Sequence, residues 1–323
     1  MESNDIEKYK LTIEEYNRCL AMAEIGVFMQ GNEVVGKKPK SIFVVAQAGA
    51  GKTGLKSFII NEAQDNGTLE TFIEFNPDDI ATYHKYYNEI LREFPDNSYK
   101  ILQEFVRPAL DTYLRQRAVE LRNNIVQEGT FGSTDGYIKI LDFQKNGGKA
   151  NIGEVKEDGT REEKLIEGNY DIEINVLAVD RFESYLSSLE REQYFRESHL
   201  SPRVVTLNNH DYAYNKMLDT LRIIESRRMF DRCRVFKRGY SVNRPELVHI
   251  SGDGKYQSVV EAVIAERNKN RKELLREPQK FYERIEKLRA RILNNGIDEQ
   301  ITRLDELKTL FDLEVEKKEN VKE

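Results

Sequence analysis

The chain has 323 residues, about a third of them charged, and a formal net charge of −6 at pH 7. This length allows a sizeable core and two units, and the acidic balance argues against general nucleic-acid binding, for which a basic excess is expected. Because no apolar run is long enough to span a bilayer and residues 1–7 are polar and acidic, unlike a signal peptide, we expect a cytoplasmic protein with no membrane partner.

The chain is expected to open with a helix that leads into a buried strand. Residues 11–30 have amphipathic helical spacing, with Thr12 as the cap and Glu15 three residues later. Polar residues 32–40 then link this helix to the apolar run Ile42–Val45, which is typical of a strand buried in a sheet.

A phosphate-binding loop follows this strand directly. Residues 46–53 match the P-loop pattern G-x-x-x-x-G-K-[ST], with Ala46 at the first glycine, a position that alanine can occupy while φ stays negative. Small residues let backbone N–H groups point at phosphate oxygens, and the start of the next helix, over 53–64, adds partial positive charge. The side chain of Lys52 can reach the outer phosphates, and the Thr53 hydroxyl can hold Mg²⁺. We therefore expect phosphate groups to contact Ala48, Gly49, Ala50, Gly51, Lys52 and Thr53.

The rest of the first 255 residues predicts an α/β fold with a parallel sheet. Strands alternate with helices, an order that places ligands outside the carboxyl ends of the strands. Asp78, Glu128 and the P-loop all lie at such ends. The expected strands are 72–75, followed by a turn over 76–79, then 124–127, 172–179 and 234–237; the expected helical segments are 95–123, 180–197 and 209–229.

Two parts are expected outside this core. Residues 145–170 are polar and rich in glycine, which favours a surface β-hairpin turning at 157–160. Residues 256–323 carry two apolar stripes separated by Asn294-Asn295-Gly296, as in a helical hairpin. The sequence thus predicts a three-layer α/β P-loop domain over 1–255, with an insertion at about 145–170, and a helical C-terminal extension over 256–323.

Several motifs beyond the P-loop share one pattern. They are Asn76-Pro77-Asp78-Asp79 after the second strand, Glu128-Gly129-Thr130 after the third, a helix that contains Arg191, and Ser201-Pro202-Arg203 followed by His210-Asp211. Together they resemble the zeta toxin family of P-loop kinases, the toxin halves of bacterial toxin–antitoxin pairs. The resemblance runs from about residue 11 to residue 240 and implies ATP-dependent phosphorylation of UDP-N-acetylglucosamine at the 3′-hydroxyl of the sugar, with an antitoxin as partner.

The resemblance also implies a role for each matching residue. Asp78 would be the base that takes the proton from the sugar hydroxyl, with Asp79 as the adjacent candidate, and Glu128 and Thr130 would position the sugar. Arg191 and Arg203 would close over the phosphates from a helical lid, a role that suits the bidentate fork of arginine. The phosphates that the P-loop residues Ala48, Gly49, Ala50, Gly51, Lys52 and Thr53 bind would be those of ATP, with Mg²⁺ at Thr53.

Structural interpretations of the same residues stay open. Asp78 and Asp79 are also suited to capping the following helix, and His210-Asp211 to capping the next one. Arg191 has acidic neighbours in the sequence and suits a solvated helix face.

The substrate is the least defined part of the prediction. Many family members carry an arginine where this chain has Gly132, and that arginine helps to hold the substrate phosphate; Lys139 and Lys145 are candidate replacements. Two other functions therefore stay open: a P-loop kinase of another small hydroxyl compound, or a non-catalytic protein in which ATP orders a binding surface.

Overall fold

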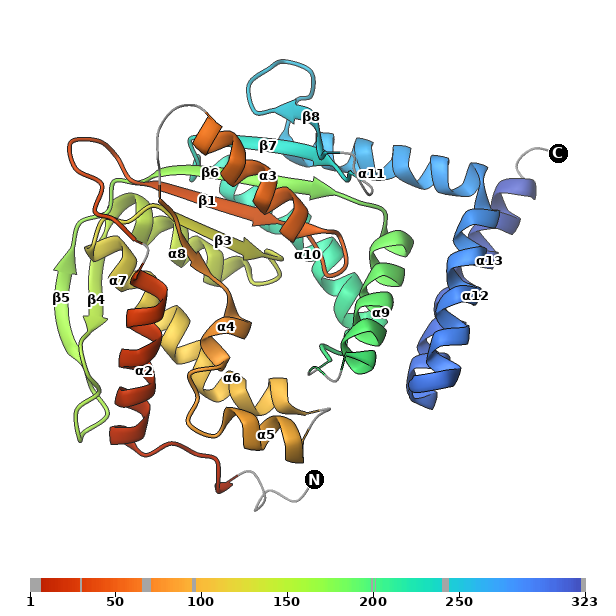
Figure 1. Ribbon diagram of the computed structural model, residues 1–323. Helices are drawn as coiled ribbons and strands as arrows, with labels where there is room; N and C mark the ends of the chain where they lie inside the picture. The colour runs from red at the N-terminus through yellow and green to blue at the C-terminus, as the bar shows by residue number, and fades with distance from the viewer. Residues whose placement is uncertain are drawn as a thin grey trace. The chain divides into compact units, whose positions relative to one another are not determined.

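The computed structural model describes residues 7–29, 31–65, 71–94, 97–198, 200, 202–239 and 244–320. Its strands confirm the predicted α/β class: a six-stranded sheet has the order β2-β3-β1-β6-β7-β8, and a second sheet has two strands (Figure 1). The strands are β1 (Lys40–Val45), β2 (Ile73–Phe75), β3 (Ile125–Gly129), β4 (Gly148–Ile152), β5 (Glu162–Ile166), β6 (Asp171–Ala178), β7 (Arg232–Lys237) and β8 (Glu246–Ile250). Pairs β2–β3 and β6–β7 are parallel, whereas β7–β8 is antiparallel.

The chain divides into two compact units, and it passes between them several times. The first unit comprises Met1–Phe43, Ala63–Glu128 and Ile138–Ile172; the second comprises Val44–Glu62, Gly129–Tyr137 and Glu173–Glu323. Residues 256–323 belong to the same compact unit as the P-loop.

The first unit begins with the predicted N-terminal helix, α2 (Ile13–Phe28). Thr12 and Glu15 form the expected capping box, in which each side chain accepts a hydrogen bond from the other residue's backbone N–H. The helical stretch predicted over 95–123 is less regular than expected. It consists of α6 (Ser98–Ala109), a π-helical turn η1 (Leu110–Leu114) and α7 (Arg115–Glu120), and Pro108 lies inside α6 just before the turn.

The predicted hairpin insertion is confirmed in this unit. Strands β4 and β5 pair antiparallel, from Gly148 opposite Ile166 to Ile152 opposite Glu162. Its turn has Gly159 at φ 79°, and the Asp158 carboxylate accepts hydrogen bonds from the Thr160 backbone and hydroxyl. The hairpin is preceded by α8 (Thr134–Asn146).

The second unit contains the helices that flank the P-loop and the three C-terminal helices. The predicted helix over 53–64 is confirmed as α3 (Lys52–Asp65), and those over 180–197 and 209–229 as α9 (Arg181–Glu197) and α10 (Leu207–Ser226). Strand β8 was not predicted, because its five residues carry no strict alternation of apolar side chains. The remaining helices are α11 (Val259–Arg276), α12 (Pro278–Asn295) and α13 (Asp298–Asn320).

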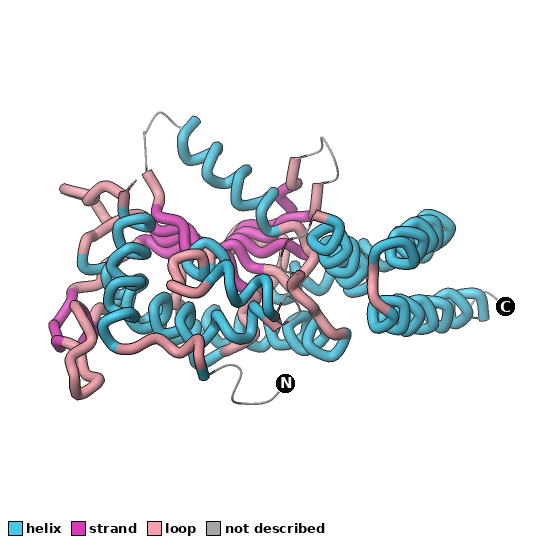
Figure 2. The backbone as a smooth tube through the Cα atoms, turned by 60° about the horizontal axis from the view of Figure 1, so that its bottom comes forward, coloured by secondary structure: helices cyan, strands magenta, loops and turns pink. Residues whose placement is uncertain are grey.

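The predicted helical hairpin is formed by α12 and α13, which lie side by side (Figure 2). Their apolar stripes also enclose one face of α9 in a common core. The shared buried residues are Phe182, Tyr185, Leu186 and Leu189 from α9, Leu207 from α10, Phe281, Ile285, Leu288 and Ile292 from α12, and Leu304, Leu307 and Phe311 from α13. A buried ion pair joins the same elements, with Arg303 donating to both carboxylate oxygens of Glu192 at 2.7 and 2.8 Å. The hairpin is therefore part of the core that holds α9.

Among the described residues, no helix is both long enough and apolar enough to cross a membrane.

Candidate phosphate-binding and catalytic residues

The P-loop of the second unit has the backbone that a phosphate cradle needs. Gly49 and Gly51 adopt φ of 72° and 95°, in the left-handed region that glycine tolerates best. Ala46 is absent from the described residues with positive φ, and its N–H donates to the Gly129 carbonyl at 3.1 Å. The alanine therefore replaces the usual first glycine without strain, as predicted.

Gly49 is also required by its surroundings. A Cβ atom at this position would lie 1.9 Å from the Ser184 carbonyl oxygen and 2.7 Å from the Ser188 backbone nitrogen, both in α9. Neither backbone atom can move without displacing the helix. The turn of the P-loop is thus packed directly against α9.

Lys52 curls over the loop. Its Nζ donates to the Ala46 and Gln47 carbonyl oxygens, at 3.0 and 3.1 Å. The ammonium group of Lys52 fits the terminal phosphates of a nucleotide. The exposed Thr53 at the start of α3, the left-handed backbone of the two glycines and the helix N-terminus fit the same phosphates.

The same residues fit Mg²⁺ in one particular way. Within the described ranges, no three His, Cys, Asp or Glu side chains lie close enough to share a metal ion. A magnesium ion would therefore be held by the Thr53 hydroxyl, the nucleotide phosphates and water, which suits its preference for retaining water ligands.

Thr130 lies in the loop after β3, in the second unit. Its hydroxyl accepts a hydrogen bond from the Gly132 backbone N–H at 3.3 Å. A Cβ atom at Gly129 would approach the Tyr137 hydroxyl to 2.3 Å, so any larger residue in place of the glycine of Glu-Gly-Thr would displace the Tyr137 ring. At Gly132 the nearest atom to an added Cβ is the Thr130 hydroxyl at 3.2 Å, so a side chain fits there if this hydroxyl shifts slightly.

The two predicted lid arginines are half-buried in the second unit. Arg191 lies on α9 and Arg203 in the segment between α9 and α10. The suggestion that His210-Asp211 caps α10 is wrong: the cap is Thr206, whose hydroxyl accepts from the Asn209 N–H, and the His210 side chain is buried.

Arg238 contacts the P-loop and was missed by the sequence analysis. Its Nη1 donates to the Gly49 carbonyl at 3.2 Å and to the Ser187 hydroxyl at 3.1 Å. The available signal was its position, because it directly follows β7 at a carboxyl end of the sheet.

The predicted carboxylates lie in the first unit: Asp78 and Asp79 follow β2, whereas Glu128 was expected after a strand and lies within β3, one residue before its end. Phe75 of β2 pairs with Gln127 of β3, so Glu128 lies one residue beyond this register position and Asp78 three residues beyond Phe75. Segment 76–79 is not a simple turn as predicted, because Pro77–Ala81 form a short helix, α4.

The suggestion that Asp78 or Asp79 caps this helix is wrong. The cap is Asn76, whose side chain accepts from the Asp78 N–H at 3.1 Å. The two carboxylates are exposed in the first turn of α4. The pKa of Tyr87 is raised mainly by the burial of Tyr87 itself and further by the negative charges of Asp78 and Asp79. Both carboxylates thus face solvent and the neighbouring Tyr87 instead of ending a helix.

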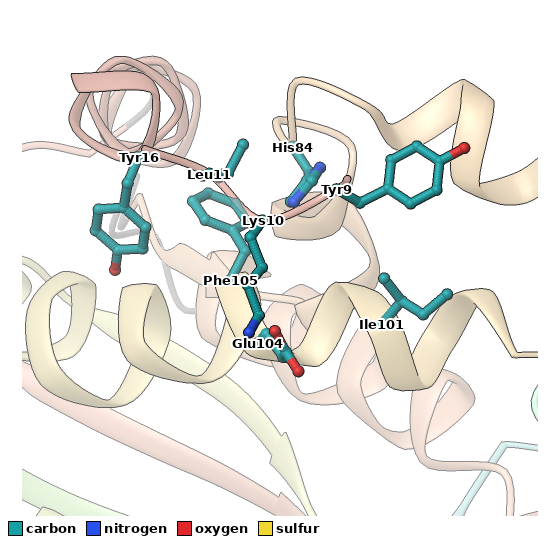
Figure 3. A pocket seen from close by; sticks show the side chains of 8 residues that line it. All are labelled: Tyr9, Lys10, Leu11, Tyr16, His84, Ile101, Glu104 and Phe105. Atoms are coloured by element: carbon teal, nitrogen blue, oxygen red, sulfur yellow. The ribbon is translucent and has the colours of Figure 1, made fainter. Parts of the chain in front are cut away.

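A cavity of about 180 Å³ also lies in the first unit (Figure 3). Its walls include the rings of Tyr9, Tyr16, His84 and Phe105, and burial lowers the pKa of His84 to about 4. Phe105 is 2% exposed and makes edge contacts with Tyr16 and His84, so these aromatic side chains pack together in the core of this unit. None of the predicted site residues lines this cavity.

The fold and the P-loop together define the class of protein. A strand buried along nearly its whole length, a glycine turn and a helix N-terminus carrying Lys-Thr are the parts of an α/β P-loop protein. The family model described as Zeta toxin matches residues 29–157 and 153–244, more than half of the chain. The chain therefore belongs to the zeta toxin family, which confirms the resemblance.

Individual relatives are distant. The chain is 24% identical over 206 residues to "Toxin PezT" of Streptococcus pneumoniae serotype 4, covering 64% of this chain and 71% of the relative. It is 24% identical over 259 residues to "Toxin zeta" of Enterococcus hirae, covering 80% and 78%. A solved structure from work on the PezAT chromosomal toxin–antitoxin system of S. pneumoniae has a similar fold, with TM-score 0.62 and 21% identity over 86% of this chain and 98% of that one.

Proposed function

We propose that the protein is an ATP-dependent kinase that phosphorylates the 3′-hydroxyl of UDP-N-acetylglucosamine and acts as the toxin of a toxin–antitoxin pair. The observation that carries this proposal is the P-loop conformation, with two left-handed glycines and Lys52 folded over the carbonyls of residues 46 and 47. Membership of the zeta toxin family supports the toxin role, and both relatives named above are toxins by name.

Each proposed residue has a task that its chemistry suits. Lys52 and the loop N–H groups bind the outer phosphates, and the forks of Arg191 and Arg203 neutralise charge on the equatorial oxygens during transfer. The exposed carboxylate of Asp78 takes the proton of the attacking sugar hydroxyl, and Glu128 and Thr130 hold the sugar. Mg²⁺, when bound at Thr53, supplies further neutralisation of phosphate charge.

The assay offers a panel of UDP-sugars and free sugars to the full chain with ATP and Mg²⁺, and detects products by mass spectrometry. We expect phosphorylated UDP-N-acetylglucosamine from the wild type and none from Lys52→Ala. Free N-acetylglucosamine should not react, because the diphosphate is part of what is recognised. Absence of any phosphorylated UDP-sugar, together with turnover on another hydroxyl compound, would overturn the substrate but not the kinase chemistry.

Gly132 favours a second candidate, a kinase of a different small hydroxyl substrate. The usual arginine is missing here, and the Gly132 N–H turns back to the Thr130 hydroxyl. Gly132→Arg distinguishes the two, since the added Cβ meets only one hydroxyl at 3.2 Å. A lower KM for the UDP-sugar would support the family substrate, whereas a loss of activity on the true substrate would favour the second candidate. Lys139→Ala tests the replacement cation: it should raise the KM for the UDP-sugar alone.

The proposed partner is an antitoxin, and the proposed location is the cytoplasm, where nucleotide sugars are available. Production of the chain alone should arrest growth, and Lys52→Ala should relieve the arrest. Growth arrest that persists in Lys52→Ala would mean that toxicity does not depend on phosphoryl transfer.

A further inference from the structure

The second residue of the P-loop, Gln47, is held by side-chain hydrogen bonds that the P-loop pattern does not require. Gln47 is 0% exposed. Its Nε2 donates to the Val179 carbonyl at 3.1 Å and to the Ser184 hydroxyl at 3.0 Å. Its Oε1 accepts from Arg267 Nη2 of α11 at 3.2 Å. The buried side-chain amide of Gln47 in the P-loop is thus hydrogen-bonded to the residue that follows β6, to α9 and to α11.

Ser184 in turn bonds to a buried histidine. Its hydroxyl lies 2.9 Å from His210 Nε2, and His210 is 1% exposed. On the other side of the ring, Nδ1 lies 3.4 Å from an Asp211 carboxylate oxygen, and Arg181 grips that carboxylate with donors at 2.6 and 2.5 Å. A carboxylate only accepts hydrogen bonds, so Asp211, held in place by Arg181, orients the Nδ1 side of the imidazole ring toward itself. We call Gln47, Ser184, His210 and Arg267 the Gln47 network.

Ser184 also touches the loop a second time. Its carbonyl oxygen is the atom that would lie 1.9 Å from a Cβ at Gly49. Two contacts, one by side chain and one by backbone, therefore fix the first turn of α9 against the P-loop. Arg191 lies seven residues further along α9, about two helical turns, and so on the same face as Ser184. A shift of Ser184 would move both the loop and Arg191.

We propose that His210 is a positioning residue: through Ser184 it holds Gln47 in place, and so sets the shape of the P-loop and its relation to Arg191. This inference rests on the proposed function, in which the loop binds ATP. His210 touches no nucleotide in this proposal. Without the imidazole, the Ser184 hydroxyl keeps the Asp180 carbonyl at 2.8 Å and Gln47 Nε2 at 3.0 Å as partners, but it loses one buried hydrogen bond and borders a new cavity. Both changes are costly, so the groups of the Gln47 network rearrange when the imidazole is removed.

The test compares four variants of the full chain. His210→Ala removes the imidazole, Ser184→Ala removes one oxygen atom, and His210→Gln keeps a polar atom near the place of Nε2. Gln193→Met is the matched control, because Gln193 is also a fully buried hydrogen-bonding residue of α9, but it bonds to Glu197 and to the Arg291 carbonyl. Each protein is measured for hydrogen exchange of peptides spanning 46–53 without nucleotide, for ATP affinity, and for kcat.

We expect faster exchange of residues 46–53 in His210→Ala and Ser184→Ala, with ATP affinity lowered roughly tenfold, the effect of losing one buried hydrogen bond. The kcat should fall as well, because Arg191 moves with α9. His210→Gln should recover much of both losses. Gln193→Met should lower the melting temperature while leaving exchange of the loop and ATP affinity unchanged.

A purely structural role for His210 gives a different result. If His210→Ala melts at a lower temperature but keeps wild-type loop exchange and ATP affinity below its melt, the proposal is wrong. If His210→Ala does not fold, Ser184→Ala carries the test with the same criteria. The hydrogen-exchange readout does not depend on ATP, so a wild type that binds no ATP would overturn the proposed function, whereas unchanged exchange in both variants would overturn this inference.

Discussion

Gly49→Ala is the sharpest test of the P-loop, because one methyl group meets two fixed backbone atoms. The φ of 72° is strained for any residue with a Cβ, at a cost of roughly 1–2 kcal/mol. The new atom would also lie 1.9 Å from the Ser184 carbonyl oxygen. Relief of such overpacking typically costs about 1–3 kcal/mol. We therefore expect a destabilisation of about 2–5 kcal/mol.

That loss is measurable as a thermal shift. At an unfolding entropy of about 2.1 cal/mol/K per residue, a chain of 323 residues loses about 3 to 7 °C in Tm. The loop must also move away from α9 to make room, so its N–H groups should converge less well on phosphate. ATP affinity should drop tenfold or more, equivalent to about 1.4 kcal/mol.

Gly54→Ala is the matched control, because Gly54 has neither a steric clash nor a positive φ. Gly54 lies in the first turn of α3, and an added Cβ meets no atom within 4 Å. Replacing a helical glycine by alanine should stabilise the chain by about 0.5–1 kcal/mol. Melting curves and ATP titrations of both variants check this contrast. If Gly49→Ala melts with Gly54→Ala and binds ATP like the wild type, the described loop conformation is wrong.

Four other predictions concern single residues. Lys52→Ala should abolish ADP release with little change in the thermal melt, and unchanged turnover would contradict its role on phosphates. Asp78→Asn should keep ATP affinity but lower sugar phosphorylation roughly 10²-fold or more; a large loss in Asp79→Asn instead would move the base by one residue. Arg203→Lys should lower kcat more than it raises the KM for ATP, because a point charge lacks the fork, and a pure KM effect would refute this. Burial lowers the pKa of His84 from 6.5 to about 4, so the stability that the neutral imidazole contributes is complete above pH 6.5 and is lost as the pH falls through 4. His84→Leu should therefore flatten the dependence of Tm on pH between these values. An equally steep dependence in the variant would refute the lowered pKa of His84.

The parts of the fold that were predictable have local signals. The capping box at Thr12, the apolar strand before the P-loop and the turn at Gly159 depend on residues close together in sequence, and each was predicted within a few positions. The apolar stripes of α12 and α13 likewise predicted their hairpin, because helical spacing places one buried face on each helix.

The parts that were missed depend on contacts between distant segments. Asn76, not Asp78, caps α4, because either side chain suits a cap and only the backbone geometry decides. Arg238 and the Gln47 network act through residues that no local pattern connects to the P-loop. His210 could be noted in the sequence, but its bond to Ser184 could not, since it requires α9 and α10 to be packed together.

The bond between Gln47 and Arg267 spans 220 residues of sequence, which has a consequence for synthesis on the ribosome. The N-terminus of the chain emerges first, so the P-loop leaves the ribosomal exit tunnel long before α11 does. At 5–20 residues per second, the interval is on the order of ten to forty seconds. During this time the loop lacks the guanidinium that anchors its amide, and α9 lacks the apolar cover of α12 and α13. The nascent polypeptide cannot complete its phosphate cradle until α11 has left the ribosome.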